Sequence, residues 1–342
     1  MVRCSANKTI IKVFGGEIME KWKLDVAVLC IFFARPTQFA QCFEQVRKAR
    51  PRVLLLWQDG PREGRQDDVE NITECRRIAE NIDWECEVHR NYHDKNMGCD
   101  PSTFYSHKWA FSIVDKCIIL EDDIVPSQSF FLFCKEMLDK YENDTRVDRI
   151  CGQTLFGGVP DKRYSYFFGR SGSSWGWASW RRVAETWQEN YEFLNDEYYL
   201  ELARHRFGHP RFERSLETAR RREKEGKPYW EHIIGFRTTL NSGLVIYPSE
   251  NMIENVGTSK NATHAPDDIA ELPLEIQSVF TTRAQEVSFP LRHPPYVIED
   301  YHYFYRMMQF LEPSAFRKLC RKAEHLYRRI VVKLRKKVEG KK

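Results

Sequence analysis

The stretch from 118 to 126, IILEDDIVP, constrains the fold of this chain more than any other segment. Three apolar residues run directly into three carboxylates, and Pro126 closes the stretch. A short apolar run of this kind predicts a buried strand of a parallel sheet. Its carboxyl end is where open α/β sheets bind ligands. We therefore expect a strand at 117–120, a stop at Pro126, and an amphipathic helix over 129–141.

The three adjacent carboxylates Glu121, Asp122 and Asp123 carry the first chemical signal. Like charges so close together repel, and the cluster is costly to bury unless a cation neutralises it. Hard oxygen ligands suit Mg²⁺ or Mn²⁺, usually shared with the phosphates of a substrate. An isolated acidic turn after a strand is more often simply solvated. The flanking strand and helix favour a metal site instead.

The first 150 residues alternate between strand-like and helix-like patterns. Expected strands cover 24–33, 52–57, 85–90 and 117–120, and expected helices cover 38–50, 69–82 and 104–114. This alternation predicts a parallel, doubly wound α/β sheet. The apolar run 26–34 could also serve as the core of a signal peptide. Asp25 before it and Arg35-Pro36 after it favour the strand.

Beyond residue 150 the composition changes. An aromatic stretch interrupted by glycines comes first, and charged helices are expected at 182–228. A helix is expected over 230–240, a strand at 244–247 and a polar loop at 255–264. We therefore divide the chain into four parts: a poorly ordered lead-in at 1–22, two halves of one domain at 23–150 and 151–300, and a tail at 301–342.

Cysteine usage and hydropathy limit the class of protein further. The ten cysteines form no CxxC pair, which favours reduced structural thiols over a zinc site or a disulfide framework. No run of 18 apolar residues is present, so no transmembrane helix is expected.

The ends of the expected strands assemble a candidate nucleotide site. Arg35 follows the first strand, Asp59 the second, and the carboxylate cluster the fourth. No GxGxxG motif follows the first strand, and no GxxxxGK[ST] motif occurs. A carboxylate-bound metal that bridges a diphosphate is the natural alternative, because it stabilises the charge on a departing phosphate.

Five segments together carry a resemblance to a known family. They are FARPTQF (33–39), QDGPR (58–62), WAFSIVDKCIILEDDIVPSQSFF (109–131), SSWGWASWRR (173–182) and YWEHIIGFRTTLNSGLVIYPSENMIENVGTSKNATH (229–264). In this order and spacing the chain resembles the GT-A fold glycosyltransferases. Within them it is similar to bacterial HlpA-like nucleotide-diphospho-sugar transferases related to N-acetylglucosaminyltransferase I. The resemblance implies a GT-A type, mixed and mostly parallel sheet flanked by helices.

The resemblance also implies roles at single positions. Asp123 would bind the Mn²⁺ or Mg²⁺ ion, with Asp122 near the ribose. Asp59 would contact the base of the nucleotide, and Arg35 the nucleotide as well. His264 would be a second contact to the metal or the diphosphate. Trp175, Gly176 and Trp177 would shape the pocket for the sugar and the acceptor.

Glu231 would be the general base, at a position where similar enzymes carry an aspartate. The longer side chain changes the placement of the carboxylate, and His232 next to it is an alternative base. Similar enzymes also place a base-contacting histidine just before the equivalent of Trp109. This chain has Ser106 there, with His107 beside it.

These assignments predict a glycosyltransferase that moves a hexosyl or N-acetylhexosaminyl group. The donor would be a nucleotide-diphospho-sugar, and the acceptor a hydroxyl of a glycan or a lipid-linked glycan, in surface polysaccharide or glycan assembly. The inverting outcome follows from the resemblance alone. One alternative is a noncatalytic nucleotide-sugar-binding protein on a transferase fold. A nucleotidyltransferase is disfavoured, because FARPTQF supplies no glycine-rich phosphate loop.

The C-terminal segment is strongly basic. Residues 314–342 hold 12 Lys and Arg against 2 Glu, whereas the whole chain has a net charge of only +4. Apolar residues recur in it at three- and four-residue steps. Over 314–338 this predicts a basic amphipathic helix, suited to an anionic membrane surface or packed on the body. We expect a cytoplasmic protein, peripheral at the inner face of the plasma membrane, and no nucleic-acid partner, since no recognised module accompanies the charge.

Overall fold

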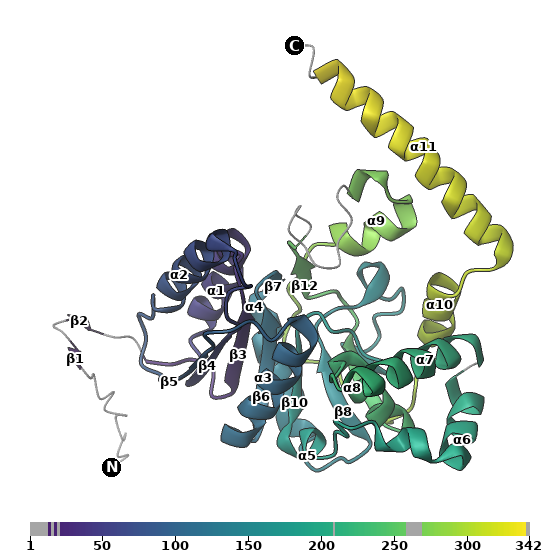
Figure 1. The fold of residues 1–342 in the computed structure, drawn as a ribbon. Coiled ribbons are helices and arrows are strands. Elements are labelled where there is room, and N and C mark those ends of the chain that lie inside the picture. Colours follow the sequence, from purple (N-terminus) through teal and green to yellow (C-terminus); the bar gives the residue numbers. More distant parts are fainter. Residues whose placement is uncertain (1–12, 15–16, 19–20, 208, 258–268, 340–342) are drawn as a thin grey trace.

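An eight-stranded mixed sheet organises the protein (Figure 1). The structure is a computed structural model, and it describes residues 13–14, 17–18, 21–207, 209–257 and 269–339. The strand order is β5-β4-β3-β6-β10-β8-β11-β9. The bounds are β3 Ala27–Phe32, β4 Val53–Gln58, β5 Glu87–Tyr92, β6 Lys116–Glu121, β8 Val147–Cys151, β9 Tyr166–Gly169, β10 Trp177–Trp180 and β11 Leu244–Pro248.

The half formed by β5, β4, β3 and β6 is parallel throughout, as the βα alternation predicts. All six residues of β3 are buried, because helices cover both faces of the sheet. The apolar run at 26–34 is therefore an inner strand. In the other half, β10 runs antiparallel between β6 and β8, β8 and β11 are parallel, and β9 closes the edge antiparallel. The mixed, mostly parallel α/β sheet is confirmed.

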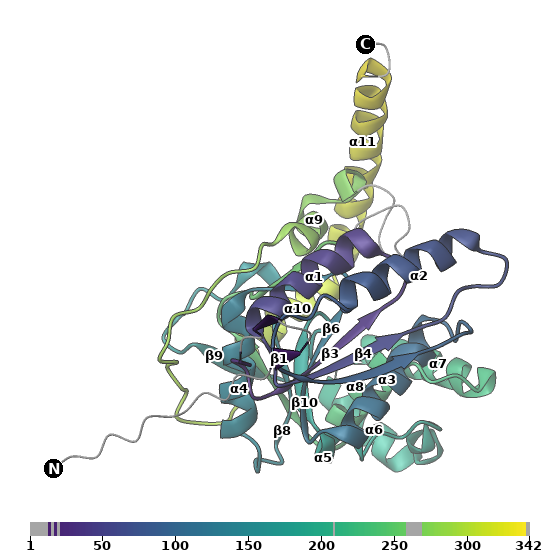
Figure 2. The ribbon, with the colours of Figure 1, turned by 90° about the vertical axis from the view of Figure 1, so that its left-hand side faces the viewer.

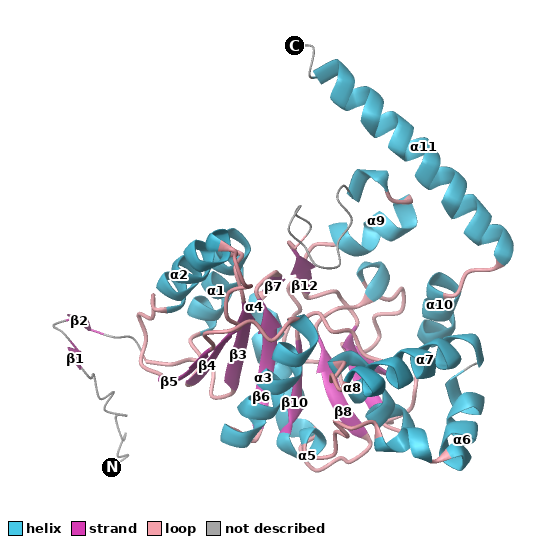
Figure 3. Cartoon of the chain, viewed as in Figure 1, coloured by secondary structure: helices cyan, strands magenta, loops and turns pink. Residues whose placement is uncertain are grey.

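The helices form two layers that follow the alternation of side chains along the strands (Figure 2). Val28, Cys30 and Phe32 of β3 pack in one core with three helices. These are α1 Pro36–Ala49, α2 Gln66–Ala79 and α4 Gln128–Lys140. Ala27, Leu29 and Ile31 face the second core. Its helices are α3 Cys99–Ile113, α5 Arg181–Ala184, α6 Glu197–Phe207, α7 His209–Glu225 and α8 Trp230–Leu240. Figure 3 shows the same layers by element type.

The structure corrects the expectation that Pro126 stops a strand. The central strand β6 ends earlier, at Glu121. Ile124–Pro126 forms a second short strand, β7, which pairs antiparallel with β12, Ile253–Asn255. Pro126 is tolerated because this ribbon has only two strands, so the missing N–H of the proline leaves no inner ladder bond unmade.

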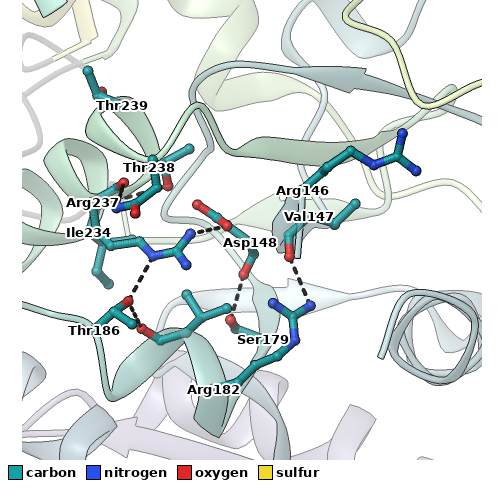
Figure 4. Close-up of polar contacts among 12 residues, drawn as sticks. Arg146, Val147, Asp148, Ser179, Arg182, Thr186, Ile234, Arg237, Thr238 and Thr239 are labelled. Atoms are coloured by element: carbon teal, nitrogen blue, oxygen red, sulfur yellow. Dashed lines mark hydrogen bonds and ion pairs between the residues drawn. The ribbon is translucent and has the colours of Figure 1, made fainter. Parts of the chain in front are cut away.

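A buried ion pair ties strand β8 to helix α8 (Figure 4). Arg237 of α8 pairs with Asp148 of β8, and its Nε donates to Oγ1 of Thr186 at 2.8 Å. The hydroxyl of Ser179 on β10 donates to the carbonyl of Asp148 at 2.7 Å. Gly243 leaves room for the Asp148 carboxylate, because a Cβ at this position would collide with it. Strand β8, which the sequence reading missed, is thus held by polar as well as apolar contacts.

The predicted tail divides into two parts. Helix α10, Tyr301–Leu311, packs on the sheet, where Tyr303 and Met307 join a core cluster with Val245 and Tyr247 of β11. Helix α11, Ala315–Glu339, projects from the body (Figure 1). A short helix, α9 Leu274–Thr281, and a 3-10 turn, η3 Ile269–Glu271, hold its near side.

The two ends of the chain and the thiols complete the description. Most of the predicted lead-in lies outside the described residues, and within it β1 Val13–Phe14 pairs with β2 Glu17–Ile18. Nine cysteines of the described part are free thiols, as expected. Within the described ranges no helix is both long enough and apolar enough to span a bilayer.

Candidate functional site

The carboxylate cluster lies at the carboxyl end of β6, beside the end of β3. The backbone N–H of Phe33 donates to Oδ2 of Asp122 at 3.1 Å. Arg35 bridges both aspartates: one amino group pairs with Asp122, and the other lies 2.9 Å from Oδ2 of Asp123. Asp122 is buried, whereas Asp123 keeps part of its side chain in solvent. Arg35 and the two acids, which follow neighbouring strands, therefore lie together in the fold.

Burial and mutual repulsion dominate the electrostatics of this cluster. Burial raises the pKa of Asp122 to about 6, although the charge of Arg35 opposes the shift. Burial likewise raises the pKa of Glu121 well above its ordinary value, and the charges of Asp123, Glu231 and Asp122 add to it. For Arg35, burial alone lowers the pKa, but the two aspartates outweigh it and raise the pKa above the usual value. One arginine against three carboxylates leaves the cluster short of positive charge.

The segment after β12 closes over Asp123. The N–H of Val256 donates to the carbonyl of Asp123 at 2.9 Å. Gly257 follows, and a Cβ at this position would collide with the Asp123 carboxylate. The carboxylate thus occupies the space that only a glycine leaves free. His264, the predicted second contact in this segment, lies outside the described residues.

The donor set around Asp123 fits a divalent cation that is completed by a ligand. Among the described residues, no group of three or more His, Cys, Asp or Glu side chains is arranged to enclose a metal. Mg²⁺-type sites commonly take one or two carboxylates and fill the remaining positions with water and substrate phosphates. Asp123, partly exposed at the end of β6, matches this pattern. An incoming cation would compete with Arg35 for the carboxylate oxygens.

Asp59, predicted to contact the base, is already occupied by its own loop. Its carboxylate accepts hydrogen bonds from the N–H groups of Gly60, Met97 and Gly98 at 2.9 to 3.2 Å, and from the Asn96 amide at 3.0 Å. Burial raises the pKa of Asp59, and these backbone donors oppose the shift. In this structure Asp59 fixes the loop at 96–98, beside the start of helix α3.

A cavity of about 390 Å³ opens in the second half of the molecule. Glu231 of α8 and Trp175 of the WGW segment both line it. Glu231 is exposed, and its charge contributes to the raised pKa of Glu121. Arg35 and the three acids of the cluster are not among the residues that line this cavity. Other polar lining residues include Arg149, Gln153, Ser173, Ser174 and Thr239.

The remaining members of the WGW segment, Gly176 and Trp177, pack in the interior next to the cavity residue Trp175. Trp177 is buried on β10 and stacks near Trp230, with ring centroids 6.2 Å apart. Gly176 has a φ of +60°, and a Cβ there would collide with Ile253. Of the three residues, only Trp175 lines the cavity, with its ring 5.6 Å from that of Phe280.

His107 lies in an aromatic cage away from any ligand surface. It is fully buried, with Trp177 and Trp230 about 5 Å from its ring and Trp187 at 6.1 Å. Burial lowers its pKa to about 3, and the charge of Arg149 adds to this effect. His107 is therefore a neutral core residue of this structure. Ser106 is buried too, and its hydroxyl donates to the carbonyl of Thr103.

Two residues that the sequence reading did not single out belong to this region: Gly257, which faces Asp123, and Arg149, which lines the cavity. Gly257 lies inside the segment 229–264 that carries the family resemblance, two residues after Asn255. That spacing is the sequence feature that could have identified it. Arg149 follows Asp148 in a short charged strand, and nothing in the local pattern distinguishes it from a surface arginine.

Comparisons with known proteins give fold-level likenesses only. No family model matches the chain, and no curated protein matches it. Among solved structures, a mannosyltransferase from Pyrobaculum calidifontis in complex with GDP-Man and Mn²⁺ is 12% identical over 48% of each chain, with a TM-score of 0.33. The match thus spans about half the length of that enzyme. Mouse xyloside xylosyltransferase 1 is 10% identical, over 64% of this chain and 81% of its own, with a TM-score of 0.32.

A third similar structure is 4-diphosphocytidyl-2C-methyl-D-erythritol synthase from Anaerococcus prevotii. It is 10% identical over 51% of this chain and 78% of its own, with a TM-score of 0.28.

Proposed function

We propose that this protein is a metal-dependent glycosyltransferase that uses a nucleotide-diphospho-sugar donor. One observation carries the proposal: Arg35 joins Asp122 and Asp123 at the carboxyl end of β6, and the charge of Glu231, which lines the cavity, acts on Glu121 of the same cluster. A divalent cation held by Asp123 would neutralise the diphosphate as it leaves. Arg35 and Asp122 would orient the nucleotide. The cavity would hold the acceptor.

Glu231, which lines the cavity, would be the general base. It would accept the proton of an acceptor hydroxyl while that oxygen attacks the anomeric carbon. Direct attack opposite the leaving group inverts the configuration, and no covalent enzyme intermediate is needed. His232 on the same helix also lines the cavity and is the alternative base.

Donor binding tests the metal site first. Thermal shift and titration calorimetry with UDP-, GDP-, CMP- and dTDP-sugars, with and without Mn²⁺, should show one nucleotide class that raises the Tm only when Mn²⁺ is present. Asp123→Ala should abolish this rise. Asp161→Ala is the matched control, since Asp161 is a largely exposed aspartate paired with an exposed arginine. Folded wild-type protein that binds no donor would overturn the proposal.

Turnover then separates an enzyme from a noncatalytic nucleotide-sugar-binding protein. With the bound donor and Mn²⁺, the wild type should slowly release the nucleoside diphosphate by hydrolysis. Glu231→Gln should keep donor affinity and slow this release by about 10²- to 10⁴-fold, because it removes the proton acceptor. A loss in His232→Gln alone would make the histidine the base. Tight donor binding without any release would favour the binding-protein alternative.

We further propose that helix α11 places the enzyme at an anionic membrane surface on the cytoplasmic side. Large apolar side chains form an exposed stripe along it: Phe316, Leu319, Leu326, Tyr327, Ile330 and Leu334. Arg321 and Arg329 pair with acids of α9 and η3, which fixes the opposite side of the helix on the body. The helix is attached to the body, and it keeps an apolar stripe with basic flanks suited to acidic lipids. A lipid-linked or surface glycan acceptor fits this placement.

A further inference from the structure

Arg149 is a buried cation whose charge has no protein counterpart in the described part of the chain. It lies in strand β8 and is 5% exposed. No described carboxylate comes within 4 Å of its guanidinium, and its Nε is buried without a hydrogen-bond acceptor. The guanidinium lies over the ring of Trp177, 5.6 Å from the centroid. Gly172 provides its space, because a Cβ there would collide with the guanidinium.

Other arginines with little exposure in this region are all paired. Arg237 pairs with Asp148, and Arg35 pairs with Asp122 and Asp123. Arg170, which also lines the cavity, pairs with Glu299 and donates to the carbonyl of Arg206 at 2.7 Å. The adjacent carboxylate of Asp148 is directed to Arg237 and leaves Arg149 uncompensated. Because burying an unpaired charge is costly, such an arrangement indicates a counter-charge that arrives from outside.

The cavity gives that counter-charge a route to Arg149. Arg149 lines it together with Gln153, Ser173 and Thr239, and Glu231 lines the same cavity. Hydroxyl and amide groups of this kind suit the hydroxyls of a sugar, and a guanidinium suits a planar or tetrahedral oxyanion. A ligand that presents its oxyanion to Arg149 can therefore place a hydroxyl near Glu231.

We propose that Arg149 is the oxyanion-binding subsite of the acceptor pocket, so that the acceptor is an acidic glycan bearing a carboxylate or a phosphate. This inference rests on the proposed function, which it refines by naming the class of acceptor. The cation–π contact with Trp177 keeps the guanidinium in place in the free protein. Arg149 is here a binding residue and takes no part in bond making.

Direct binding without metal or donor tests the subsite independently of turnover. The probes are glucuronate and glycerol phosphate, with glucose as the neutral control, followed by titration calorimetry and tryptophan fluorescence. Wild type should bind one acidic probe at least tenfold more tightly than glucose, and added salt should weaken that binding. The preferred probe distinguishes a carboxylate from a phosphate acceptor. Arg149→Gln should lose the preference, whereas Arg163→Gln, a change at an exposed arginine, should keep it.

Two further variants locate the subsite. They also keep the inference testable if Arg149→Gln fails to fold. Gly172→Ala leaves every charge in place but displaces the guanidinium, so it should also weaken the binding of the acidic probe. Arg35→Gln alters the donor site and should leave it unchanged. The inference is overturned if folded wild type binds acidic and neutral probes with equal affinity. It is also overturned if Arg35→Gln loses the preference for the acidic probe and Gly172→Ala keeps it. Mn²⁺-dependent donor binding should persist in Arg149→Gln. If it does, a failure of the oxyanion subsite leaves the proposed donor site intact, so the two proposals are tested separately.

Discussion

At the scale of single residues, Gly257 shows how the backbone shapes the surroundings of Asp123, the proposed metal ligand. The glycine lies against the Asp123 carboxylate, and the neighbouring N–H of Val256 holds the carbonyl of Asp123. Any side chain at 257 must push one of the two segments away. Since a ligand displaced by about an ångström loses much of its function, the position governs geometry more than stability.

We expect Gly257→Ala to weaken Mn²⁺-dependent donor binding by at least tenfold while the Tm changes by only a few degrees. Titration calorimetry with the nucleotide-sugar that the donor panel selects measures the affinity. Gly235→Ala is the control, because this helical glycine has open space at its Cβ and should keep donor affinity. Unchanged affinity in Gly257→Ala would show that Asp123 adjusts freely, against the packing described here.

His107 makes stability depend on pH. In the unfolded chain a histidine titrates near pH 6.5, whereas burial lowers the pKa of His107 to about 3. Between these values the unfolded state takes up a proton that the folded state excludes. The free energy of unfolding should therefore fall with decreasing pH below 6.5, by up to about 1.4 kcal/mol per pH unit from this group.

Urea unfolding of wild type and His107→Leu between pH 4 and 7 measures this contribution as the difference between two slopes. The variant should be less sensitive to acid, although the lost cage contacts lower its stability at pH 7. His205→Leu, at an exposed histidine, should keep the wild-type slope. Parallel curves for wild type and His107→Leu would contradict the burial of a neutral imidazole.

What the sequence predicts at this scale depends on distance along the chain. The acids at 121–123 are predictable because a strand and its end are local features. The engagement of Asp59 by Met97 and Gly98 is not, since it depends on a loop 38 and 39 residues away. Arg149 is missed for the same reason: its lack of a partner is a property of the folded surroundings.

At the scale of elements, the Asp148–Arg237 pair connects β8 and α8, the elements that carry Arg149 and Glu231. Both side chains are almost fully buried, at 1% and 11% exposure. Removing one partner leaves the other charge without compensation, which typically costs about 3–5 kcal/mol. The pair therefore acts as a brace between two elements that both line the cavity.

Arg237→Met should lower the free energy of unfolding by about 3–5 kcal/mol. The double variant Arg237→Met with Asp148→Leu should regain part of that loss, because it removes both charges. Chemical denaturation measures each step, and Arg163→Met, from an exposed pair, should stay within about 0.5 kcal/mol of wild type. A single variant that unfolds like the wild type would show that the pair is solvated.

Strand prediction succeeds and fails for identifiable reasons. Strands β3, β4 and β6 are apolar runs buried on both faces, which local composition reveals. Strand β8 has the sequence VDRIC, in which the two central charges conceal it. Those charges are tolerated because α8 supplies the partner of Asp148 and the cavity receives Arg149. A helix about 90 residues further along the chain is not visible in the local pattern.

At the scale of the whole molecule, helix α11 presents its apolar stripe in a direction fixed by the body. Its near side is clamped to α9, where Glu275 accepts hydrogen bonds from Arg321, and the N–H of Leu274 donates to Glu324. Because this clamp is polar and specific, the exposed apolar stripe points in a fixed direction relative to the sheet. A membrane bound by the stripe would therefore meet one defined face of the body.

The protein should co-sediment with vesicles that contain phosphatidylserine and much less with pure phosphatidylcholine, and added salt should weaken the binding. The double variant Leu326→Glu with Ile330→Glu should abolish it without lowering the Tm, since both side chains are exposed. Leu202→Glu, at an exposed leucine of α6, is the control. Equal sedimentation of the double variant would assign the stripe to another role.

Strand β10 also has a consequence for how the chain reaches its fold. It pairs with β6 on one side and β8 on the other, so the two halves of the sheet share no direct ladder without it. During synthesis, β3 to β6 emerge first, and β6 remains an unpaired edge until residues 177–180 arrive. An exposed apolar edge invites association between chains. The acids at the end of β6 and the packing of α3 and α4 on the sheet then protect the nascent chain until β10 forms. Without β10 the edge of β6 stays open, so the first half alone would be prone to aggregate.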